Sequence, residues 1–318
     1  MKNLIILFSV MLLSHSGSYA MSTYVTSYQS LKNAIEHARP YDTIIIEEGA
    51  KIDFTDEKTI VIDKPISLKG DLGYSKIRPR FISKGKNTIL KISANDVQVS
   101  NINFEGAQRD TKKEEIIAYN RRTGTNSGVY QYPVTKGIHV TGHSVTVSGV
   151  EISGFSHAGI FVDGAKSFLV ENAKIHHNQR WGLGYGVCLN SNATAKILDS
   201  DFDYNRHSIA GSGSPGQSYE AAYNVFGDHH TATPLDMHGG KDRGDGTNIA
   251  GHTVNIHNNR IYEVDHYIFI HRGIAQNKVI ITRNYLRDTN KPSFIGYYNV
   301  RSSDVGPEKF YFDLNYND

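Results

Sequence analysis

The residues best suited to chemistry gather in one stretch of the sequence, residues 228–242. It reads Asp-His-His-Thr-Ala-Thr-Pro-Leu-Asp-Met-His-Gly-Gly-Lys-Asp, which combines groups that move protons with groups that bind metals. Two basic pairs, Arg206-His207 and His271-Arg272, lie about one repeat before it and one repeat after it. We therefore expect the functional site where these three segments meet.

Strand alternation predicts which side chains in this stretch share a face. Leu235 and Met237 are apolar and should face inward, so that Asp236 and His238 face outward on the same side. Stacked strands would then bring outward residues of the neighbouring repeats beside them, namely Arg206, Tyr267 and His271. A slip of one residue would exchange Arg206 for His207.

This set contains the groups that β-elimination from an acidic polysaccharide requires. Arg206 or Arg272 would neutralise the uronate carboxylate, and His238 or His271 would remove the proton beside it. Tyr267 would protonate the leaving oxygen. A uronate epimerase needs similar groups, so epimerisation stays open.

Two other functions remain open at this point. A glycoside hydrolase needs two carboxylates about 5–9.5 Å apart, and Asp236 has several candidate partners: Asp228, Asp242, Asp245 and Asp265. A non-catalytic glycan-binding or adhesin protein would use the same groups only as surface ion pairs. The convergence of polar residues from three repeats favours an enzyme.

Metal binding is a further hypothesis for the same stretch. His229, His230, Asp236 and His238 offer imidazole and carboxylate ligands that suit zinc or a similar divalent ion. Their spacing fits no familiar metal motif, so the cofactor stays open.

Candidate substrate-binding residues lie on both sides of this stretch. Trp181 is the only tryptophan, and with Arg180 and Tyr185 it could line a glycan groove. Lys241 and Asp242 begin a charged insertion, residues 239–251, that should project from the solenoid. Residues 105–133 are also charged, and we expect them to form a loop excursion.

The rest of the chain is organised as a repeat. Units such as 145–152, 168–175 and 195–202 end on apolar residues separated by 23, 27, 24, 35 and 25 residues, up to residue 286. No unit can bury its own apolar face, so neighbouring units must stack. A second strand follows each unit and predicts a second parallel sheet. A small or polar residue shortly before each unit's end suits a left-handed corner and an Asn ladder: Gly149, Asn172, Ser200, Asn224, Asn259 and Asn284.

The two ends of this repeat region differ from it. Residues 28–39 have helical spacing, with Ser30 as a candidate N-cap, and should cap the open end of the core. Residues 1–20 resemble a cleaved signal peptide, which predicts a secreted or periplasmic protein with a mature domain over 21–318. The formal net charge of +2 gives no general attraction to nucleic acid or membrane, and the single Cys188 excludes an internal disulfide.

The repeat rhythm, the Asn corners and the N-terminal helix resemble the right-handed parallel β-helix, or pectin-lyase-like, superfamily. The segments 205–211, 235–240 and 271–273 resemble those of uncharacterised secreted members. The resemblance implies an all-β fold, a single solenoid with a capping helix, and a polysaccharide substrate. Neither the aspartate pattern of polygalacturonases nor the arginine signature of pectate lyases is present, so the reaction is not implied.

Overall fold

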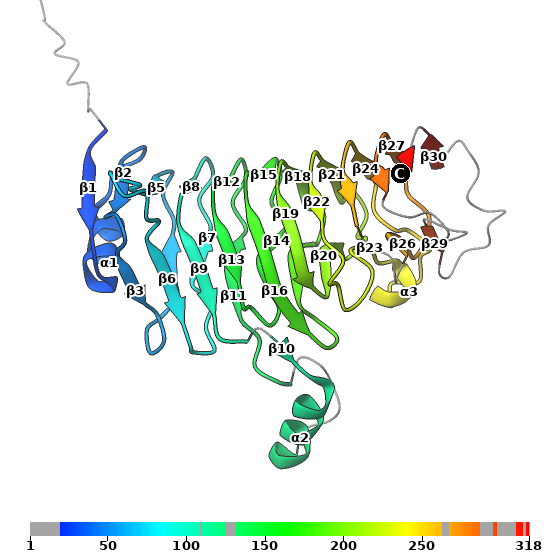
Figure 1. The fold of residues 1–318 in the computed structure, drawn as a ribbon, viewed down its shortest axis with the longest axis horizontal. Helices are drawn as coiled ribbons and strands as arrows, with labels where there is room; N and C mark the ends of the chain where they lie inside the picture. Colours follow the sequence, from blue (N-terminus) through cyan, green and yellow to red (C-terminus); the bar gives the residue numbers. More distant parts are fainter. Residues whose placement is uncertain are drawn as a thin grey trace, which may run out of the picture.

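The fold is a parallel β-helix of stacked coils. The computed structural model describes residues 20–108, 110–124, 131–262, 267–286, 295–297, 310–313 and 316–317. Every strand pair in these residues is parallel, and successive coils run along one axis from α1 at one end to the C-terminal strands at the other (Figure 1). The all-β, right-handed solenoid predicted from the sequence is confirmed. The expected signal peptide lies outside the described residues, apart from Ala20.

Each coil contributes one strand to each of three sheets, which we name A, B and C in the order that the chain visits them. Sheet A contains β1 (Ser22–Val25), β2 (Thr43–Ile46), β5 (Ser67–Gly70), β8 (Gln98–Ser100), β12 (Thr146–Ser148), β15 (Phe168–Glu171), β18 (Thr194–Leu198), β21 (Ser218–Ala222), β24 (Thr253–His257), β27 (Lys278–Thr282) and β30 (Phe310–Asp313). Sheet B contains β3 (Lys51–Asp53), β6 (Arg80–Ser83), β9 (Asn103–Gly106), β13 (Glu151–Ser153), β16 (Lys174–Arg180), β19 (Asp201–Asn205), β22 (Val225–Phe226), β25 (Arg260–Ile261), β28 (Tyr285–Leu286) and β31 (Tyr316–Asn317), with β10 (Asp110–Thr111) paired to β16. Sheet C contains β4 (Ile60–Ile62), β7 (Leu90–Ile92), β11 (Lys136–Val140), β14 (Ala158–Asp163), β17 (Tyr185–Asn190), β20 (His207–Gly211), β23 (Leu235–Met237), β26 (Phe269–His271) and β29 (Ile295–Tyr297).

The sequence predicted two sheets, and the third comes from a corner inside each repeated unit. One residue at the centre of each unit has a positive φ: Gly149, Asn172, Asp199, Tyr223, Asn258 and Arg283. This left-handed residue turns the chain, so the first half of the unit joins sheet A and the second half joins sheet B. The predicted second sheet is sheet C, and the corner divides the predicted first sheet into sheets A and B.

An Asn ladder crosses the last of these corners, one residue after the left-handed position. Asn259 Oδ1 accepts hydrogen bonds from the backbone N–H (2.9 Å) and Nδ2 (3.1 Å) of Asn224. Asn259 Nδ2 in turn donates to Asn284 Oδ1 (2.8 Å) and to the carbonyl of Ala221 (2.9 Å). The predicted ladder is confirmed. The expectation that these asparagines also take the left-handed conformation was wrong, because Tyr223, Asn258 and Arg283 take it instead.

The core consists of rows of inward side chains that stack from coil to coil. Residues in register repeat the same apolar type, as in the stacked rings of Phe202 and Phe226, whose centroids lie 5.4 Å apart. Helix α1 (Tyr28–His37) covers the N-terminal end of this core with Leu31 and Ile35, as predicted. Its N-cap is Ser27, and the predicted cap Ser30 completes the capping box from the third helical position.

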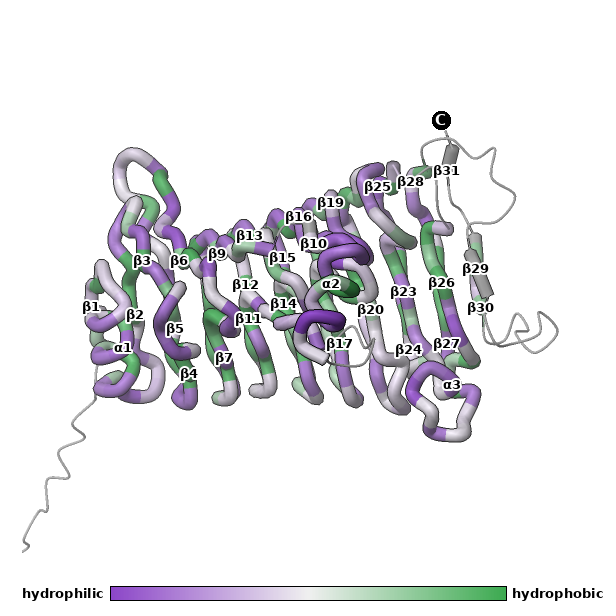
Figure 2. The backbone as a smooth tube through the Cα atoms, turned by 90° about the horizontal axis from the view of Figure 1, so that it is seen from below, coloured by the Kyte–Doolittle hydropathy of each residue, from purple (hydrophilic) through white to green (hydrophobic). Residues whose placement is uncertain are grey.

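Two short helices leave the solenoid near sheet C. The excursion at 105–133, predicted as a loop, contains helix α2 (Lys113–Thr123), and the insertion at 239–251 contains helix α3 (Gly240–Arg243). Figure 1 shows α2 standing below the solenoid, and Figure 2, seen from below, shows it in front of the sheet that carries β14 and β17. Among the described residues, no helix is long and apolar enough to cross a membrane.

The ladder gives a direct test of the corner. Asn259 is 1% exposed, so Asn259→Ala would leave buried donors and acceptors unpaired on both neighbouring coils. We expect the free energy of unfolding to fall by about 3 kcal/mol in urea denaturation. The matched control is Asn255→Ala, four residues earlier on β24, where the half-buried side chain makes no hydrogen bond with a described residue; it should change stability by less than about 0.5 kcal/mol. Equal effects of the two variants would contradict the ladder's role.

Candidate active site

The central group of the site is the carboxylate of Asp236, on the outer side of β23. Asp236 lies in register with Ala210 on β20 and with Ile270 on β26, and it is 0% exposed. Arg272 grips both oxygens: its Nε donates to Oδ1 at 2.8 Å and its Nη2 donates to Oδ2 at 2.7 Å. Such a bidentate pair fixes both the position and the orientation of the carboxylate.

Two histidines approach the same carboxylate from neighbouring positions. His238 Nε2 lies 3.2 Å from Asp236 Oδ2, and its Nδ1 lies 3.6 Å from Asp242 Oδ2. His207 Nε2 lies 3.4 Å from Asp236 Oδ2, while its Nδ1 donates to the carbonyl of Thr233. We call Asp236, Arg272, His207 and His238 the Asp236 cluster. His238 is its exposed member, with a side chain that is 30% exposed.

The protonation state of this cluster follows from its contacts. Burial alone would raise the pKa of the Asp236 carboxyl, but the hydrogen bonds from His238 and Arg272 hold that pKa well below its usual range. Burial also lowers the pKa of His207 to about 3, so this ring is neutral at neutral pH. We therefore assign most of the stabilisation of the carboxylate to Arg272.

A groove opens on the outer face of sheet C beside this cluster. It is a cavity of about 280 Å³, and its lining residues are His157, Phe161, Tyr185, Cys188, Leu189, Asn190, Ala210, Gly211, Ser212 and His238. His238 is the member of the Asp236 cluster that reaches the groove, and Tyr185 offers a phenol within it. The groove therefore joins a charged cluster to an aromatic wall. The thiol of Cys188 is not its nucleophile, because burial raises its pKa to about 12.

Arg206 and His207 take the places that a one-residue slip allowed. His207, rather than Arg206, faces Asp236, and its ring stacks on Tyr185 with centroids 5.8 Å apart. The guanidinium of Arg206 also lies over the ring of Tyr185, 6.0 Å from the ring centroid. Arg206 Nη1 is buried and has no hydrogen-bond partner among the described residues.

The predicted outward position of His271 was wrong. Strand β26 pairs with β23 so that His271 lies opposite Met237 and Phe269 lies opposite Leu235, which turns both side chains inward. His271 is 1% exposed, and its Nε2 donates to the carbonyl of Ala250 at 3.0 Å. The inward ring of Phe269 fills the core, which leaves Ile270 outward.

Tyr267, the predicted acid, does not reach the groove. It precedes β26, is 41% exposed, and is not among the groove-lining residues. Tyr185 provides the phenol instead.

The predicted substrate-binding residues divide between two roles. Arg180 is 0% exposed and donates to the carbonyls of Pro133 (3.1 Å) and Tyr132 (3.2 Å), so it anchors the base of the α2 excursion and was wrongly predicted as a substrate contact. Trp181 is 42% exposed, and the ammonium of Lys113 on α2 lies 5.2 Å from its ring. Because its ring faces solvent, Trp181 remains a predicted surface on which a sugar ring could stack.

The insertion beside β23 supports the cluster through Asp242. Besides lying near His238, Asp242 accepts the backbone N–H of Gly239 (3.3 Å) at the start of α3. Lys241 is exposed on α3. Of the other candidate hydrolase carboxylates, Asp245 is paired with Arg243 at 2.7 Å, and Asp265 lies outside the described residues.

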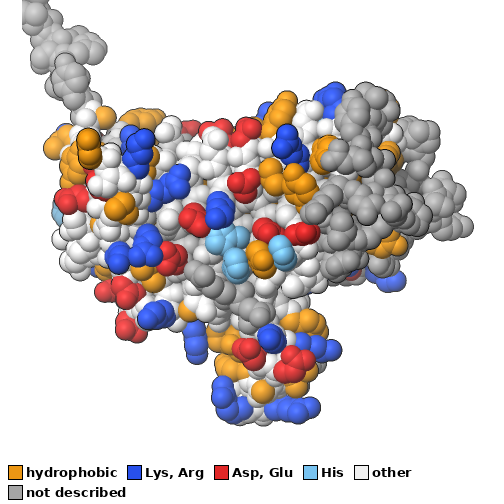
Figure 3. Space-filling view, in the orientation of Figure 1, with side chains coloured by type: hydrophobic (Ala, Val, Ile, Leu, Met, Phe, Trp, Pro, Cys, Tyr) orange, Lys and Arg blue, Asp and Glu red, His pale blue; other side chains and the backbone are white. Residues whose placement is uncertain are grey.

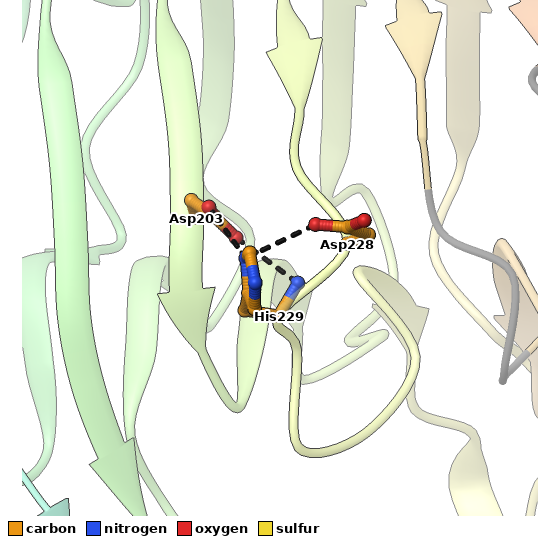
Figure 4. Close-up of side chains that lie close together, drawn as sticks. All are labelled: Asp203, Asp228 and His229. Carbon is orange, nitrogen blue, oxygen red and sulfur yellow. Dashed lines mark hydrogen bonds and ion pairs between the residues drawn. The ribbon is translucent and has the colours of Figure 1, made fainter.

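The four predicted metal ligands do not gather around one point. His230 is buried, with Nε2 2.6 Å from Ser208 Oγ, while Asp236 and His238 belong to the Asp236 cluster. His229 lies elsewhere, 3.0 Å from a carboxylate oxygen of Asp203 and 3.0 Å from one of Asp228 (Figure 4). The predicted set was therefore wrong, because the turn after β22 points its two histidines in different directions.

The three side chains in Figure 4 are those of the described residues that could hold a metal ion. Figure 3 shows histidine and acidic side chains gathered in the middle of the face that it presents. Stacking of His229 on Tyr204, with centroids 4.2 Å apart, and the contacts to the two carboxylates account for the cluster without an ion.

One groove residue and two of its neighbours were missed in the sequence. Phe161 on β14 lines the groove, and His139 and Lys136 on β11 lie beside its ring. Alternation about the inward residues Ile138 and Ile160 places His139 and Phe161 on the outer face of sheet C, but it assigns Lys136 to the inward side.

Comparison with known proteins supports the fold. No protein-family model and no curated protein matches the sequence. Among solved structures, the chain is similar to an alginate lyase from Paenibacillus sp. str. FPU-7, with 15% identity and a TM-score of 0.65 over 93% of this chain and 95% of that one. It is similar to a family 28 exopolygalacturonase from Yersinia enterocolitica, with 10% identity and a TM-score of 0.63 over 94% of this chain and 66% of that one. It is also similar to pectate lyase Pel9A, with 11% identity and a TM-score of 0.57 over 95% and 79%. These neighbours are parallel β-helices, so the predicted fold resemblance is confirmed.

The ion pair at the centre of the site makes a stability prediction. Asp236→Asn would leave Arg272, whose side chain is 22% exposed, without its counter-charge. We expect the free energy of unfolding to fall by about 3–5 kcal/mol in urea denaturation. Combining Asp236→Asn with Arg272→Met should restore part of this loss, because no uncompensated cation remains. The exposed Asp201 on β19 supplies the control, Asp201→Asn; an Asp236→Asn effect as small as the control's would refute the pairing.

Buried histidines predict a fall in stability on mild acidification. Burial lowers the pKa of His157 and His207 to about 3 and that of His271 to about 4, from 6.5. The unfolded chain therefore binds more protons than the folded chain below the unfolded pKa, and stability is lost as the pH falls towards the folded values. Between about pH 6.5 and 5, each such histidine should steepen the slope of unfolding free energy by up to about 1.4 kcal/mol per pH unit.

The single variant His271→Gln isolates one of these contributions. Gln keeps a donor for the carbonyl of Ala250 but does not titrate, so the slope in this pH range should become shallower. His37→Gln, on the exposed face of α1, should leave the slope unchanged. Parallel slopes for the wild type and His271→Gln would mean that His271 is not held neutral.

Proposed function

We propose that this protein is a polysaccharide-active enzyme that cleaves an acidic glycan by β-elimination. The observation that carries the proposal is the Asp236 cluster, in which a fixed carboxylate orients His238 at the edge of a groove. With its Nε2–H directed at Asp236, the neutral form of His238 has its lone pair on Nδ1, which lies 3.6 Å from Asp242 Oδ2 and is the nitrogen that can accept a proton. This is the arrangement by which a carboxylate fixes the tautomer of a general base.

The other roles belong to Arg206 and Tyr185. Tyr185 lines the groove, and the guanidinium of Arg206 lies over its ring, 6.0 Å from the centroid. Arg206 is a cation with an unpartnered, buried Nη1, so it can neutralise the carboxylate of a bound uronate. Arg272 is not suited to this role, because Asp236 already occupies its guanidinium. Tyr185 replaces the predicted Tyr267 as the proton donor, since its ring lies between Arg206 and His207.

The reaction balances with these three residues. His238 removes the proton from the carbon beside the uronate carboxylate, and the electron pair forms a double bond to the neighbouring carbon. The glycosidic carbon–oxygen bond at that neighbouring carbon breaks, and its oxygen takes the phenol proton of Tyr185. The positive charge of Arg206 stabilises the negative charge that builds up on the carboxylate in the transition state.

Hydrolysis is less well supported by the same residues. A glycosidase needs one protonated carboxylic acid beside the bond, and the pKa of Asp236 is held low while its carboxylate is buried against Arg272. Alginate lyase and pectate lyase have the same fold, so polyuronates are the substrate class that we propose first. The expected signal peptide would deliver such an enzyme to the periplasm or the medium.

The test is turnover of a panel of polyuronates by the mature chain and its variants. His238→Gln should lower kcat by about 10²–10⁴-fold, because it removes the base and keeps a donor to Asp236. Arg206→Met should lower kcat/KM by about 10²-fold. His252→Gln is the control, since His252 is exposed at the start of β24 and outside the groove. Full activity in His238→Gln would overturn the assignment, and a change of sugar configuration without new chain ends would indicate an epimerase.

A further inference from the structure

Four side chains surround a second polar centre on sheet C. The ring of Phe161 on β14 lines the groove, and the ammonium of Lys136 on β11 lies over it, 4.4 Å from the ring centroid. The rings of His139 and His157 flank the same ring, with centroid distances of 5.2 Å and 4.8 Å. One cation and two imidazoles therefore share one aromatic surface.

No carboxylate among the described residues pairs directly with the cation in this group. Lys136 is half-buried, and it makes no ion pair or hydrogen bond with a described residue through its ammonium. The nearby acid, Asp163, is already bonded through Oδ1 to Asn190 Nδ2 (3.0 Å) and Ser191 Oγ (2.7 Å). Burial lowers the pKa of the Lys136 ammonium, because a partly buried charge without a direct partner is unfavourable. A bound anion would stabilise the charged form.

The imidazoles add hydrogen-bonding groups rather than charge. Burial lowers the pKa of His139 to about 4 and that of His157 to about 3, so both rings are neutral at neutral pH. His139 Nε2 is buried and has no hydrogen-bond partner among the described residues. An unpaired buried polar atom is expensive, and a ligand oxygen beside Lys136 would satisfy it.

This centre is aligned with the Asp236 cluster along the solenoid axis. Lys136, Ala158, Tyr185 and His207 are in register on four consecutive strands of sheet C. Neighbouring strands lie about 4.8 Å apart, so Lys136 and His207 are separated by about 14 Å. The groove lies between them and is lined by Phe161 from one centre and by His238 from the other.

We propose that Lys136, His139 and His157 around Phe161 form a second carboxylate-binding subsite, which holds a uronate of the same glycan chain several sugars away from the cleaved bond. The inference rests on the proposed function and adds to it that the glycan lies lengthwise along the solenoid, across sheet C. It also defines the substrate as a polyanion, in which more than one sugar carries a carboxylate.

The test is direct binding of polyuronate to the mature chain, together with steady-state kinetics on long and short uronate chains. Lys136→Met keeps the side chain's apolar stem and removes its charge. It should weaken binding of long polyuronate about tenfold and raise KM by a similar factor, with kcat unchanged. Lys136→Arg should retain most of the affinity. Short uronate chains that cover only the Asp236 cluster should bind the wild type and Lys136→Met equally.

Matched controls separate this inference from the proposed function. Lys196→Met removes the same charge from sheet A, where Lys196 pairs with Glu220 at 3.2 Å, and should not change binding. His238→Gln should abolish turnover but still bind polyuronate. Adding Lys136→Met to His238→Gln should weaken that binding about tenfold.

If wild type binds polyuronate and Lys136→Met binds it equally, the subsite is wrong and the proposed function stands. If wild type neither binds nor cleaves any polyuronate, both fail. A loss confined to sulfated glycans would overturn the carboxylate assignment.

Discussion

Stacking of parallel coils is the constraint on which the whole structure depends. A single coil has one inward apolar row per sheet and cannot bury it alone, so each row is stable only when the next coil lies directly on it in register. The left-handed corners and the Asn ladder hold that register at the junction of sheets A and B. Because register is fixed, outward residues from distant parts of the sequence also line up in rows.

The candidate active site is a consequence of this alignment. Ala210, Asp236 and Ile270 share one outward row, and small Ala210 leaves room for the groove beside the buried carboxylate. The bidentate contact from Arg272 then holds Asp236 ionised, and Asp236 orients His238. The regular stacking of sheet C therefore places the charged carboxylate of Asp236 in a buried position, and its ion pair with Arg272 stabilises it there.

The sequence predicted the parts of this arrangement that follow from alternation and repeat length. It predicted the solenoid, the end-capping helix, and the meeting of Asp236 with His238 and with one residue of the 206–207 pair. It assigned Arg272 to the carboxylate of the substrate, whereas the structure pairs Arg272 with Asp236. It failed where alternation carries no information. Residues 268–270 are Ile-Phe-Ile, and a strand that is apolar on both faces does not reveal its orientation. His271 was assigned to the wrong face for this reason. Arg180 was wrongly assigned to the substrate because its partners, the carbonyls of Tyr132 and Pro133, lie in the excursion at 105–133, which has no repeat to align. Lys136 was missed because alternation places it on the inward side with Ile138.

Elimination and hydrolysis of the glycosidic bond differ in the source of the oxygen atoms in the products. Polyuronate would be cleaved by the mature chain in water enriched in heavy oxygen, and the products analysed by mass spectrometry and ultraviolet absorbance. Elimination predicts no heavy oxygen incorporated at cleavage, and one absorbing carbon–carbon double bond for each new non-reducing end. One heavy oxygen incorporated per cleavage, without that absorbance, would contradict elimination and identify a hydrolase.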